Sequence, residues 1–377
     1  IEAAGAAMTT LHDPIPIGDL ALKNRIAMAP LTRARTNEAG VPSSLNATYY
    51  AQRASAGLIV SEATNVSPLS AAFELAPGIY CASQAAGWGR VAEAVHARGG
   101  VIFMQLWHSG RVASAALLGG REPLSPSAVN DDLALLQVYG ALRNGRYTRL
   151  HATPARAMTE FDIYNAVNAF RQGALNAIRN GIDGVEIHAA NGYLPAQFLS
   201  PHVNRRTDLF GGTLANRARF LRLIVEALLE LMPPQRIGVR VSPFAAYNNA
   251  ADPRAAETYA YVAAMLDDHQ VGYVHAADSN AWGGDSDMAP LLRLTRAHYD
   301  GVVIANAALT PASAQALVTS GQADMAAFGR QFIANPDLVE RIAAGGPYNI
   351  PDPQSFYGGD ERGYTDYPFL STSEVPA

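Results

Sequence analysis

Short apolar segments alternate with longer segments of mixed polarity over most of the chain. The apolar segments are rich in valine and isoleucine and several begin with glycine, which is typical of buried parallel strands. They lie at Arg25–Pro30, Gly57–Ala63, Val101–Leu106, Gly184–His188, Ile237–Pro243, Tyr273–Ala277, Gly301–Asn306 and Met325–Arg330. Segments with helical spacing lie between them, among them Ala85–Ala97, Glu160–Asn180, Leu214–Leu231 and Pro311–Ser320. Strands that alternate with helices in this way predict an α/β fold, a (β/α)8 TIM barrel.

Two segments fall outside this alternation. Pro14–Leu22 has the pattern of an N-terminal hairpin with Gly18 and Asp19 at its turn, which we expect to plug the bottom of the barrel. Residues 108–158 form a long insertion after the third strand, dotted with proline and glycine, and we expect it to cap the site. No linker divides the chain, so we predict one domain over residues 1–377. Residues 1–7 are interpreted as an expression remnant or an unstructured extension.

Composition excludes several classes of function. The net charge of −5 gives no electrostatic footprint for nucleic acid or an anionic membrane, and no apolar run approaches a membrane span. Cys81 is the only cysteine, which excludes intrachain disulfides, cysteine-rich zinc sites and iron–sulfur clusters. We therefore expect no metal and a reducing, cytoplasmic setting, with the chain as a monomer or homodimer. Lys23, the only lysine, precedes the first strand, at the wrong end of a barrel for Schiff-base chemistry.

Polar residues gather where the predicted strands end, which is where catalytic groups cluster in this fold. Period-two alternation places Glu186 and His188 on the strand face opposite Val185, so they point into the barrel. Arg240 points the same way by the same argument. The polar residues at strand ends are Thr32, Gln105, His188, Arg240, Asn306 and Arg330.

Each arginine of this set has two interpretations. A buried Arg240 must meet an anion or another electron-rich acceptor, and Glu186 on the neighbouring strand is a purely structural candidate. Arg330 follows Gly329 at the start of a predicted helix, an arrangement that suits a phosphate. The alternative for Arg330 is a surface arginine on a loop.

His188, Asn191 and Tyr193 offer three hydrogen-bonding side chains within six residues. Two neutral donors can hold a carbonyl or nitro oxygen, and a nearby phenol can give up a proton. A single histidine at a strand end is more often a core residue, so the residues alone leave both interpretations open.

Motifs that contain these residues resemble the Old Yellow Enzyme family over nearly the whole chain, from about Pro14 to Leu370. Together, and in this order, the motifs are highly specific. They are Lys23–Arg33, Ser61–Thr64, Gln105–Arg111, His188–Tyr193, Phe198–Pro201, Asn204–Asp208, Phe210–Gly212, Ala327–Arg330, Ile333–Leu338 and Gly363–Pro368. Thr32 resembles the branch of the family that has threonine rather than cysteine at this position.

The resemblance implies FMN in the barrel mouth and NADPH or NADH as the reductant. It implies that the FMN ring is contacted by Pro30, Leu31, Thr32, Ala63, Gln105 and Arg240. The implied phosphate site is formed by Ala305, Asn306, Ala307, Gly329 and Arg330. It further implies that His188 and Asn191 bind the activating oxygen of the substrate and that Tyr193 donates a proton. Phe73, Trp107 and Tyr357 would shape the substrate pocket.

The function implied by this resemblance is that of an FMN-dependent ene reductase with ping-pong kinetics. Its expected substrates are electrophilic alkenes such as enones, maleimides and nitroalkenes, with nitro compounds or nitrate esters as further candidates. The rival enzyme class is a TIM-barrel hydrolase or lyase that binds a phosphate at Arg330 and uses His188 and Glu186 for acid–base chemistry. The rival non-enzyme function is a barrel that carries flavin without turnover.

Overall fold

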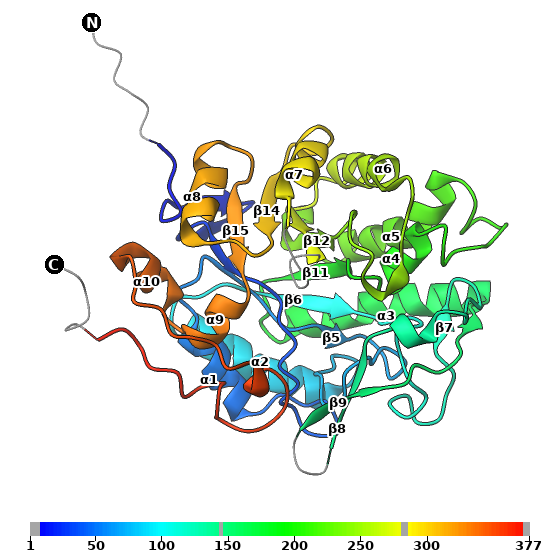
Figure 1. Cartoon of the computed structure of the whole chain (residues 1–377), viewed down its shortest axis with the longest axis horizontal. Coiled ribbons are helices and arrows are strands. Elements are labelled where there is room, and N and C mark those ends of the chain that lie inside the picture. The colour runs from blue at the N-terminus through cyan, green and yellow to red at the C-terminus, as the bar shows by residue number, and fades with distance from the viewer. Residues whose placement is uncertain (1–7, 143–145, 280–285, 372–377) are drawn as a thin grey trace, which may run out of the picture.

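The computed structural model of the chain describes residues 8–142, 146–279 and 286–371, so the extension predicted at residues 1–7 lies outside it. Eight parallel strands form a closed ring in chain order, with helices around it (Figure 1). The ring closes through the pairing of β15 with β3, and β6 pairs directly with β11. The strands are β3 (Ile26–Met28), β4 (Leu58–Val60), β6 (Ile102–Trp107), β11 (Gly184–Ala189), β12 (Ile237–Val241), β13 (Tyr273–Ala277), β14 (Val302–Asn306) and β15 (Met325–Phe328). The predicted TIM barrel is confirmed.

The predicted strands are in place, but β3, β4, β12 and β15 end two or three residues earlier than the apolar pattern indicated. β3 stops at Met28 because Pro30 has no N–H to donate to the ladder. The chain therefore leaves the sheet at Pro30 and turns over the barrel mouth. β11 is buried along its whole length, as expected of a strand covered on both sides.

The four predicted helices are confirmed as α2 (Ala82–His96), α3 (Glu160–Arg179), α5 (Leu214–Leu229) and α8 (Pro311–Thr319). Thr159 and Asp162 form a capping box at the start of α3. Further helices are α1 (Ser44–Gln52), α4 (Leu194–Leu199), α6 (Ala255–Asp268), α7 (Met288–Arg296), α9 (Arg330–Ala334) and α10 (Leu338–Ala344). Short 3-10 helices lie at η1 (Leu133–Leu135), η2 (Pro234–Arg236), η3 (Tyr247–Asn249) and η5 (Pro353–Ser355).

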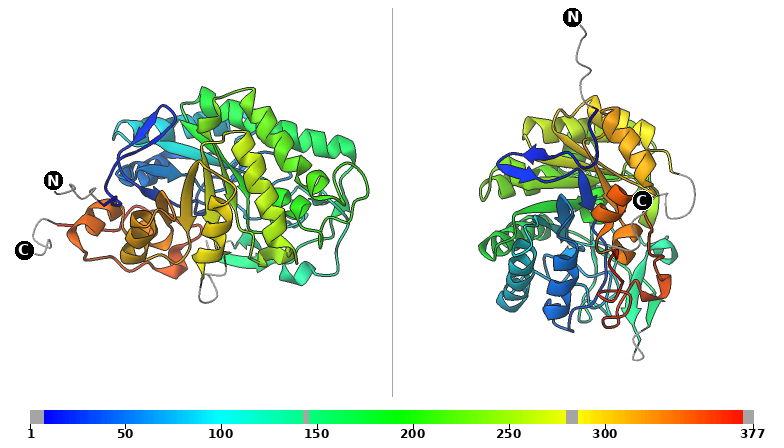
Figure 2. Two further views of the ribbon diagram at one scale, coloured as in Figure 1. Left: turned by 90° about the horizontal axis from the view of Figure 1, so that it is seen from above. Right: turned by 90° about the vertical axis from the view of Figure 1, so that its left-hand side faces the viewer.

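The N-terminal hairpin is confirmed as β1 (Ile15–Ile17) paired with β2 (Leu20–Leu22), and Gly18 in its turn has φ 59°. Ile15, Ile17 and Leu22 are buried against residues from the first halves of the barrel strands, among them Leu58. The hairpin therefore plugs the barrel at the amino ends of its strands. In both views of Figure 2 it (dark blue) lies on the far side of the barrel from the β8–β9 hairpin (teal).

The insertion after β6 contains four short strands and η1. The strands are β7 (Leu124–Ser125), β8 (Val138–Ala141), β9 (Tyr147–Leu150) and β10 (Arg156–Ala157). β8 and β9 form an antiparallel pair, whereas β7 pairs with β10 in parallel. One more short strand, β5 (Thr64–Asn65), pairs with the end of β6. The insertion, called the cap below, thus brings its own hairpin to the mouth of the barrel.

The buried guanidinium of Arg53 fixes the position of α9. It donates hydrogen bonds to the carbonyl oxygens of Phe332 and Ile333, each at 2.8 Å, and to that of Tyr364 at 3.3 Å. Figure 1 shows the C-terminal segment (red) beside α1 and α9. These bonds hold α9, which begins at Arg330, against the end of α1, where Arg53 lies.

Among the described residues, no helix combines the length and the apolar character that a membrane crossing requires.

Candidate functional site

Two connected cavities lie at the carboxyl ends of the barrel strands. The first has a volume of about 420 Å³ and lies under the cap. The second, of about 270 Å³, lies beside the loops that follow β14 and β15. Pro30, Leu31, Arg240 and Arg330 line both cavities, so together they form one elongated groove.

Most of the residues predicted for the site line this groove. The first cavity is lined by Pro30, Leu31, Thr32, Ala63, Phe73, Gln105, His188, Asn191, Tyr193, Arg240, Arg330 and Tyr357. The second adds Asn306, Ala307 and Gly329. Trp107 and Ala305 are fully buried and line neither cavity. Trp107 instead packs edge-on behind Tyr193, with ring centroids 5.1 Å apart.

The sequence analysis missed five residues of the first cavity wall, namely Gln137, Tyr139, Tyr247, Ile333 and Phe356. Gln137 and Tyr139 belong to the cap, and the ring of Tyr139 stacks on Phe73 at 5.0 Å. The Asn-Gly dipeptide at 144–145 is the sequence signal that could have revealed the hairpin of β8 and β9. Tyr247 lies in η3, after β12, and has no comparable sequence signal.

A completely buried carboxylate, Glu186, organises the polar groups beneath the groove. Gln105 donates to Glu186 through its Nε2 at 2.7 Å, and Tyr273 donates through its hydroxyl at 3.0 Å. His275 Nδ1 lies 2.8 Å from the same carboxylate. Burial by itself raises the pKa of Glu186, but His275, Arg240 and Gln105 outweigh it, and the pKa is lowered. Glu186 is therefore an anion, and it directs the amide N–H of Gln105 away from the groove.

This network decides between the two interpretations of Arg240. Arg240 forms no ion pair with Glu186 among the described residues; its Nη2 donates to Asn306 Oδ1 at 2.8 Å. The buried Nε of Arg240 has no partner in the described part of the chain. An unpaired donor on a buried cation that lines a cavity fits an electron-rich group bound there. Glu186 itself lines neither cavity, which counts against an acid–base role for it.

The loop after β11 carries His188, Asn191 and Tyr193 to the cavity wall. Asn191 and Gly192 both have left-handed backbones, with φ of 58° and 70°. A side chain at position 192 would approach the carbonyl oxygen of Tyr247 to 2.5 Å, so only glycine fits there. The tight turn brings the rings of His188 and Tyr193 together at 4.9 Å, nearly perpendicular to one another.

Burial keeps the histidine and the tyrosine of this loop uncharged. Burial, with the nearby positive charges of Arg240 and His275, lowers the pKa of His188 well below its ordinary value. Burial raises the pKa of Tyr193 above its ordinary value, and Tyr357 and Tyr139 act in the same direction. At neutral pH the cavity therefore presents a neutral imidazole and a protonated phenol, both able to donate a hydrogen bond.

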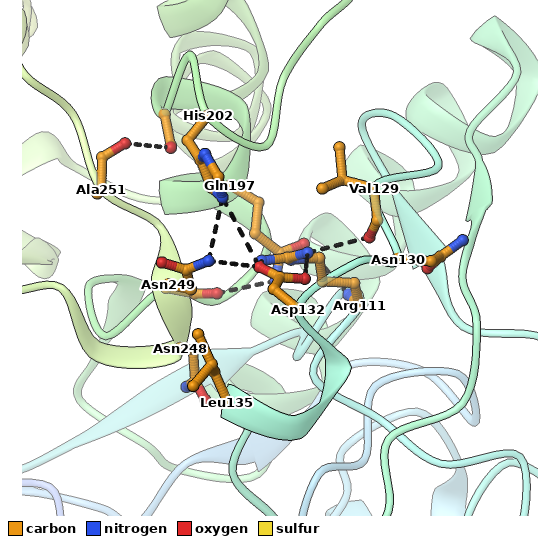
Figure 3. Close-up of polar contacts among 12 residues, drawn as sticks. Arg111, Val129, Asn130, Asp132, Leu135, Gln197, His202, Asn248, Asn249 and Ala251 are labelled. Atoms are coloured by element: carbon orange, nitrogen blue, oxygen red, sulfur yellow. Dashed lines mark hydrogen bonds and ion pairs between the residues drawn. The ribbon is translucent and has the colours of Figure 1, made fainter.

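Asp132 joins two parts of the cap and connects the cap to η3 (Figure 3). Arg111, near the start of the cap, forms a bidentate pair with Asp132 at 2.5 and 2.7 Å, and Asn249 of η3 donates to the same carboxylate at 2.6 Å. Asn248, beside it, accepts from the backbone N–H of Gln137 at 2.8 Å and donates to the carbonyl of Asn191 at 2.9 Å. η3 thus links the cap to the loop after β11, through Asn248.

The far end of the groove offers donors for an anion. Arg330 is exposed, lines both cavities and has no side-chain partner among the described residues. Ala307 and Gly329 line the second cavity, and no backbone acceptor is seen for their N–H groups in the described ranges. A guanidinium together with free backbone amides suits a phosphate group.

Comparisons with known proteins agree with this geometry. Residues 10–349 match the model of the NADH:flavin oxidoreductase / NADH oxidase family. The chain is 36% identical, over 98% of its length and 100% of the relative's, to a probable flavin mononucleotide-dependent alkene reductase of Leishmania infantum. It superposes on morphinone reductase with a TM-score of 0.93 and 42% identity, covering 98% of this chain and 99% of the other. For the old yellow enzyme homologue from Zymomonas mobilis the TM-score is 0.89 at 36% identity, with 96% and 100% covered.

The lowered pKa of His188 predicts how ligand binding depends on pH. A histidine of ordinary pKa gains its proton as the pH falls through about 6.5. Because the pKa of His188 lies well below this value, the affinity for a neutral carbonyl compound should stay flat through that pH range. Titration of binding in the parent and in His188→Asn, which keeps a neutral donor, checks this. An inflection near pH 6.5 that is present only in the parent contradicts it.

Proposed function

The chain belongs to the NADH:flavin oxidoreductase / NADH oxidase family, and on that basis we propose that it reduces electron-poor carbon–carbon double bonds. The expected resemblance to the Old Yellow Enzyme family is confirmed. The enzyme is an FMN-dependent oxidoreductase with a nicotinamide coenzyme as reductant. One observation carries the proposal: two neutral donors and a protonated phenol converge on a cavity beside the unpaired Nε of Arg240.

FMN fits the groove by the chemistry of the groups that line it. The electron-rich edge of its ring system suits Arg240 Nε, and its phosphate suits Arg330 with the amides of Ala307 and Gly329. We assign the ring contacts to Pro30, Leu31, Thr32, Ala63, Gln105 and Arg240, and the phosphate contacts to Ala305, Asn306, Ala307, Gly329 and Arg330. Ala305 is buried in β14 and would contribute only through its backbone. When bound, FMN supplies the capacity to take a hydride from a nicotinamide and to give one to an alkene carbon.

The chain's own residues orient the alkene and supply a proton. His188 and Asn191 hold the carbonyl or nitro oxygen of the substrate and stabilise the negative charge that develops there. Tyr193 gives its phenol proton to the carbon next to the activating group and is then reprotonated from water. The wall made by Phe73, Tyr139 and Tyr357 packs against the rest of the substrate, and Trp107 supports Tyr193 from behind.

The net reaction adds one hydride and one proton across the double bond. NAD(P)H and a proton are consumed for each alkene saturated, so the balance closes without another reactant. One cavity serves coenzyme and substrate, so they occupy it in turn and the kinetics are ping-pong. We place the enzyme in the cytoplasm, because its single cysteine suits a reducing compartment. We further propose that it is a monomer or homodimer and that residues 1–377 form one FMN-binding domain.

The activity is tested with the purified chain reconstituted with FMN. Under anaerobic conditions NADH or NADPH should be oxidised in equal amount to the saturated product formed from cyclohexenone, an N-substituted maleimide or a nitroalkene. A chain that cannot bind FMN would favour the hydrolase or lyase. A chain that binds FMN but consumes neither coenzyme nor alkene would favour a carrier.

Arg330→Ala should weaken FMN binding by about tenfold or more, because hydrogen bonds to a charged group contribute about 1.5–3 kcal/mol. The dissociation constant is measured from the quenching of FMN fluorescence. Arg98→Ala, which removes an exposed arginine far from the groove, is the matched control and should bind like the parent. Parental affinity in Arg330→Ala would remove this residue from the phosphate site.

Tyr193→Phe should slow the saturation of cyclohexenone by about a hundredfold, the scale of a lost general acid. Single-turnover oxidation of the coenzyme without alkene should keep its parental rate, because that step needs no proton from Tyr193. Rapid-mixing measurements separate the two steps. Tyr139→Phe, which removes another phenol from the same wall, should leave both rates unchanged. Equal slowing of the two steps in Tyr193→Phe would refute its role as proton donor.

A further inference from the structure

Asn191 is held at three points by residues of two loops, those after β12 and β13. Its backbone N–H donates to the hydroxyl of Ser242 at 2.8 Å, and its carbonyl accepts from Asn248 at 2.9 Å. Its side-chain oxygen, Oδ1, accepts a hydrogen bond from the hydroxyl of Ser279. A non-glycine residue with positive φ costs free energy, so these contacts hold a conformation that the free loop would leave.

Ser279 is the contact that acts on the side chain of Asn191 alone. It lies two residues after β13, is only 7% exposed, and its hydroxyl reaches across the mouth to the loop after β11. Neither the sequence pattern nor the family motifs singled it out. Ser242 and Asn248, in contrast, hold the backbone of Asn191, and Asn248 also holds the cap through the backbone N–H of Gln137.

An asparagine amide can present either its oxygen or its nitrogen to a cavity, because the two ends have nearly the same shape. With Oδ1 bonded to Ser279, the Nδ2 group of Asn191 is left without a partner among the described residues, and Asn191 lines the first cavity. The same side chain turned by half a rotation would point its oxygen at the bound oxygen of a ligand, and two acceptors repel each other. Ser279 would then have to accept from Nδ2 instead of donating to Oδ1, as it does here.

We propose that Ser279 is a positioning residue that fixes the amide of Asn191 with its N–H groups toward the cavity. This proposal rests on the proposed function, in which Asn191 binds the activating oxygen of the substrate. Ser279 thereby makes the site selective for ligands with an electron-rich oxygen, such as enones, nitroalkenes and phenolates. It acts through Asn191 and touches no reacting atom of the substrate.

The test compares Ser279→Ala with Ser279→Thr in the FMN-loaded enzyme. Loss of the hydroxyl frees the amide to turn, so Ser279→Ala should weaken phenol binding about tenfold, the scale of one hydrogen bond to a charged acceptor. Binding is followed by the long-wavelength absorption of the phenol complex. The KM for cyclohexenone should rise by a similar factor, with a smaller change in kcat. Ser279→Thr keeps the hydroxyl and should behave like the parent.

A double-mutant cycle separates this role from a general structural one. In an Asn191→Ala background, Ser279→Ala should have no further effect on phenol affinity. Ser279 also lines the second cavity, so FMN affinity is measured in every variant and should change far less than phenol affinity does. If Ser279→Ala were to fold poorly, Ser279→Cys, with similar size and a weaker donor, should give an intermediate phenol affinity.

Three outcomes overturn the proposal. They are parental phenol affinity in Ser279→Ala, an undiminished effect of Ser279→Ala in the Asn191→Ala background, and weakened binding in Ser279→Thr equal to that in Ser279→Ala. Failure of the proposed function has a different appearance. In that case the FMN-loaded parent neither binds phenol nor reduces cyclohexenone, and the role of Ser279 falls with it.

Discussion

The carboxylate of Glu186 lies inside the barrel with no access to solvent, and a charge in such a place must be compensated by neighbouring donors. Gln105 from β6 and the pair Tyr273 and His275 from β13 provide this compensation. β6 and β13 are thereby fastened to β11, which carries the anion, just below the groove. This requirement sets the orientation of Gln105. Because its Nε2 donates to Glu186, its Oε1 remains as the acceptor for the groove.

The same anion shapes the charges at the mouth. Burial lowers the pKa of Arg240, and the field of Glu186 counteracts this, so the guanidinium stays charged without a direct ion pair. The guanidinium of Arg240 lines the cavity and has an unused Nε, while His188, which lines the same cavity, stays neutral. The cavity thus attracts electron-rich groups without the repulsion that a second positive charge would add.

The sequence was sufficient for features that repeat or that form contiguous motifs. Eight apolar segments predicted the barrel, and alternation along β11 and β12 predicted that His188 and Arg240 point inward. Contacts between distant segments were not predictable. Tyr247 and Ser279 reach the site only because the loops after β12 and β13 fold across the mouth, and no local pattern encodes that path. The partners of Glu186 were missed for the same reason, and so was the placement of Trp107 behind Tyr193.

The attachment of the cap has a consequence for how this scaffold can diversify. Residues 108–158 meet η3 at a few polar contacts, those of Asp132 with Asn249 and of the backbone N–H of Gln137 with Asn248. Through Tyr139 in β8 they also exchange backbone hydrogen bonds with Ala72 and Glu74. A cap of different sequence that keeps these contacts and its internal Arg111–Asp132 pair can therefore be exchanged for the present one. Such exchange would change the walls around the substrate while leaving the chemistry of the barrel mouth intact.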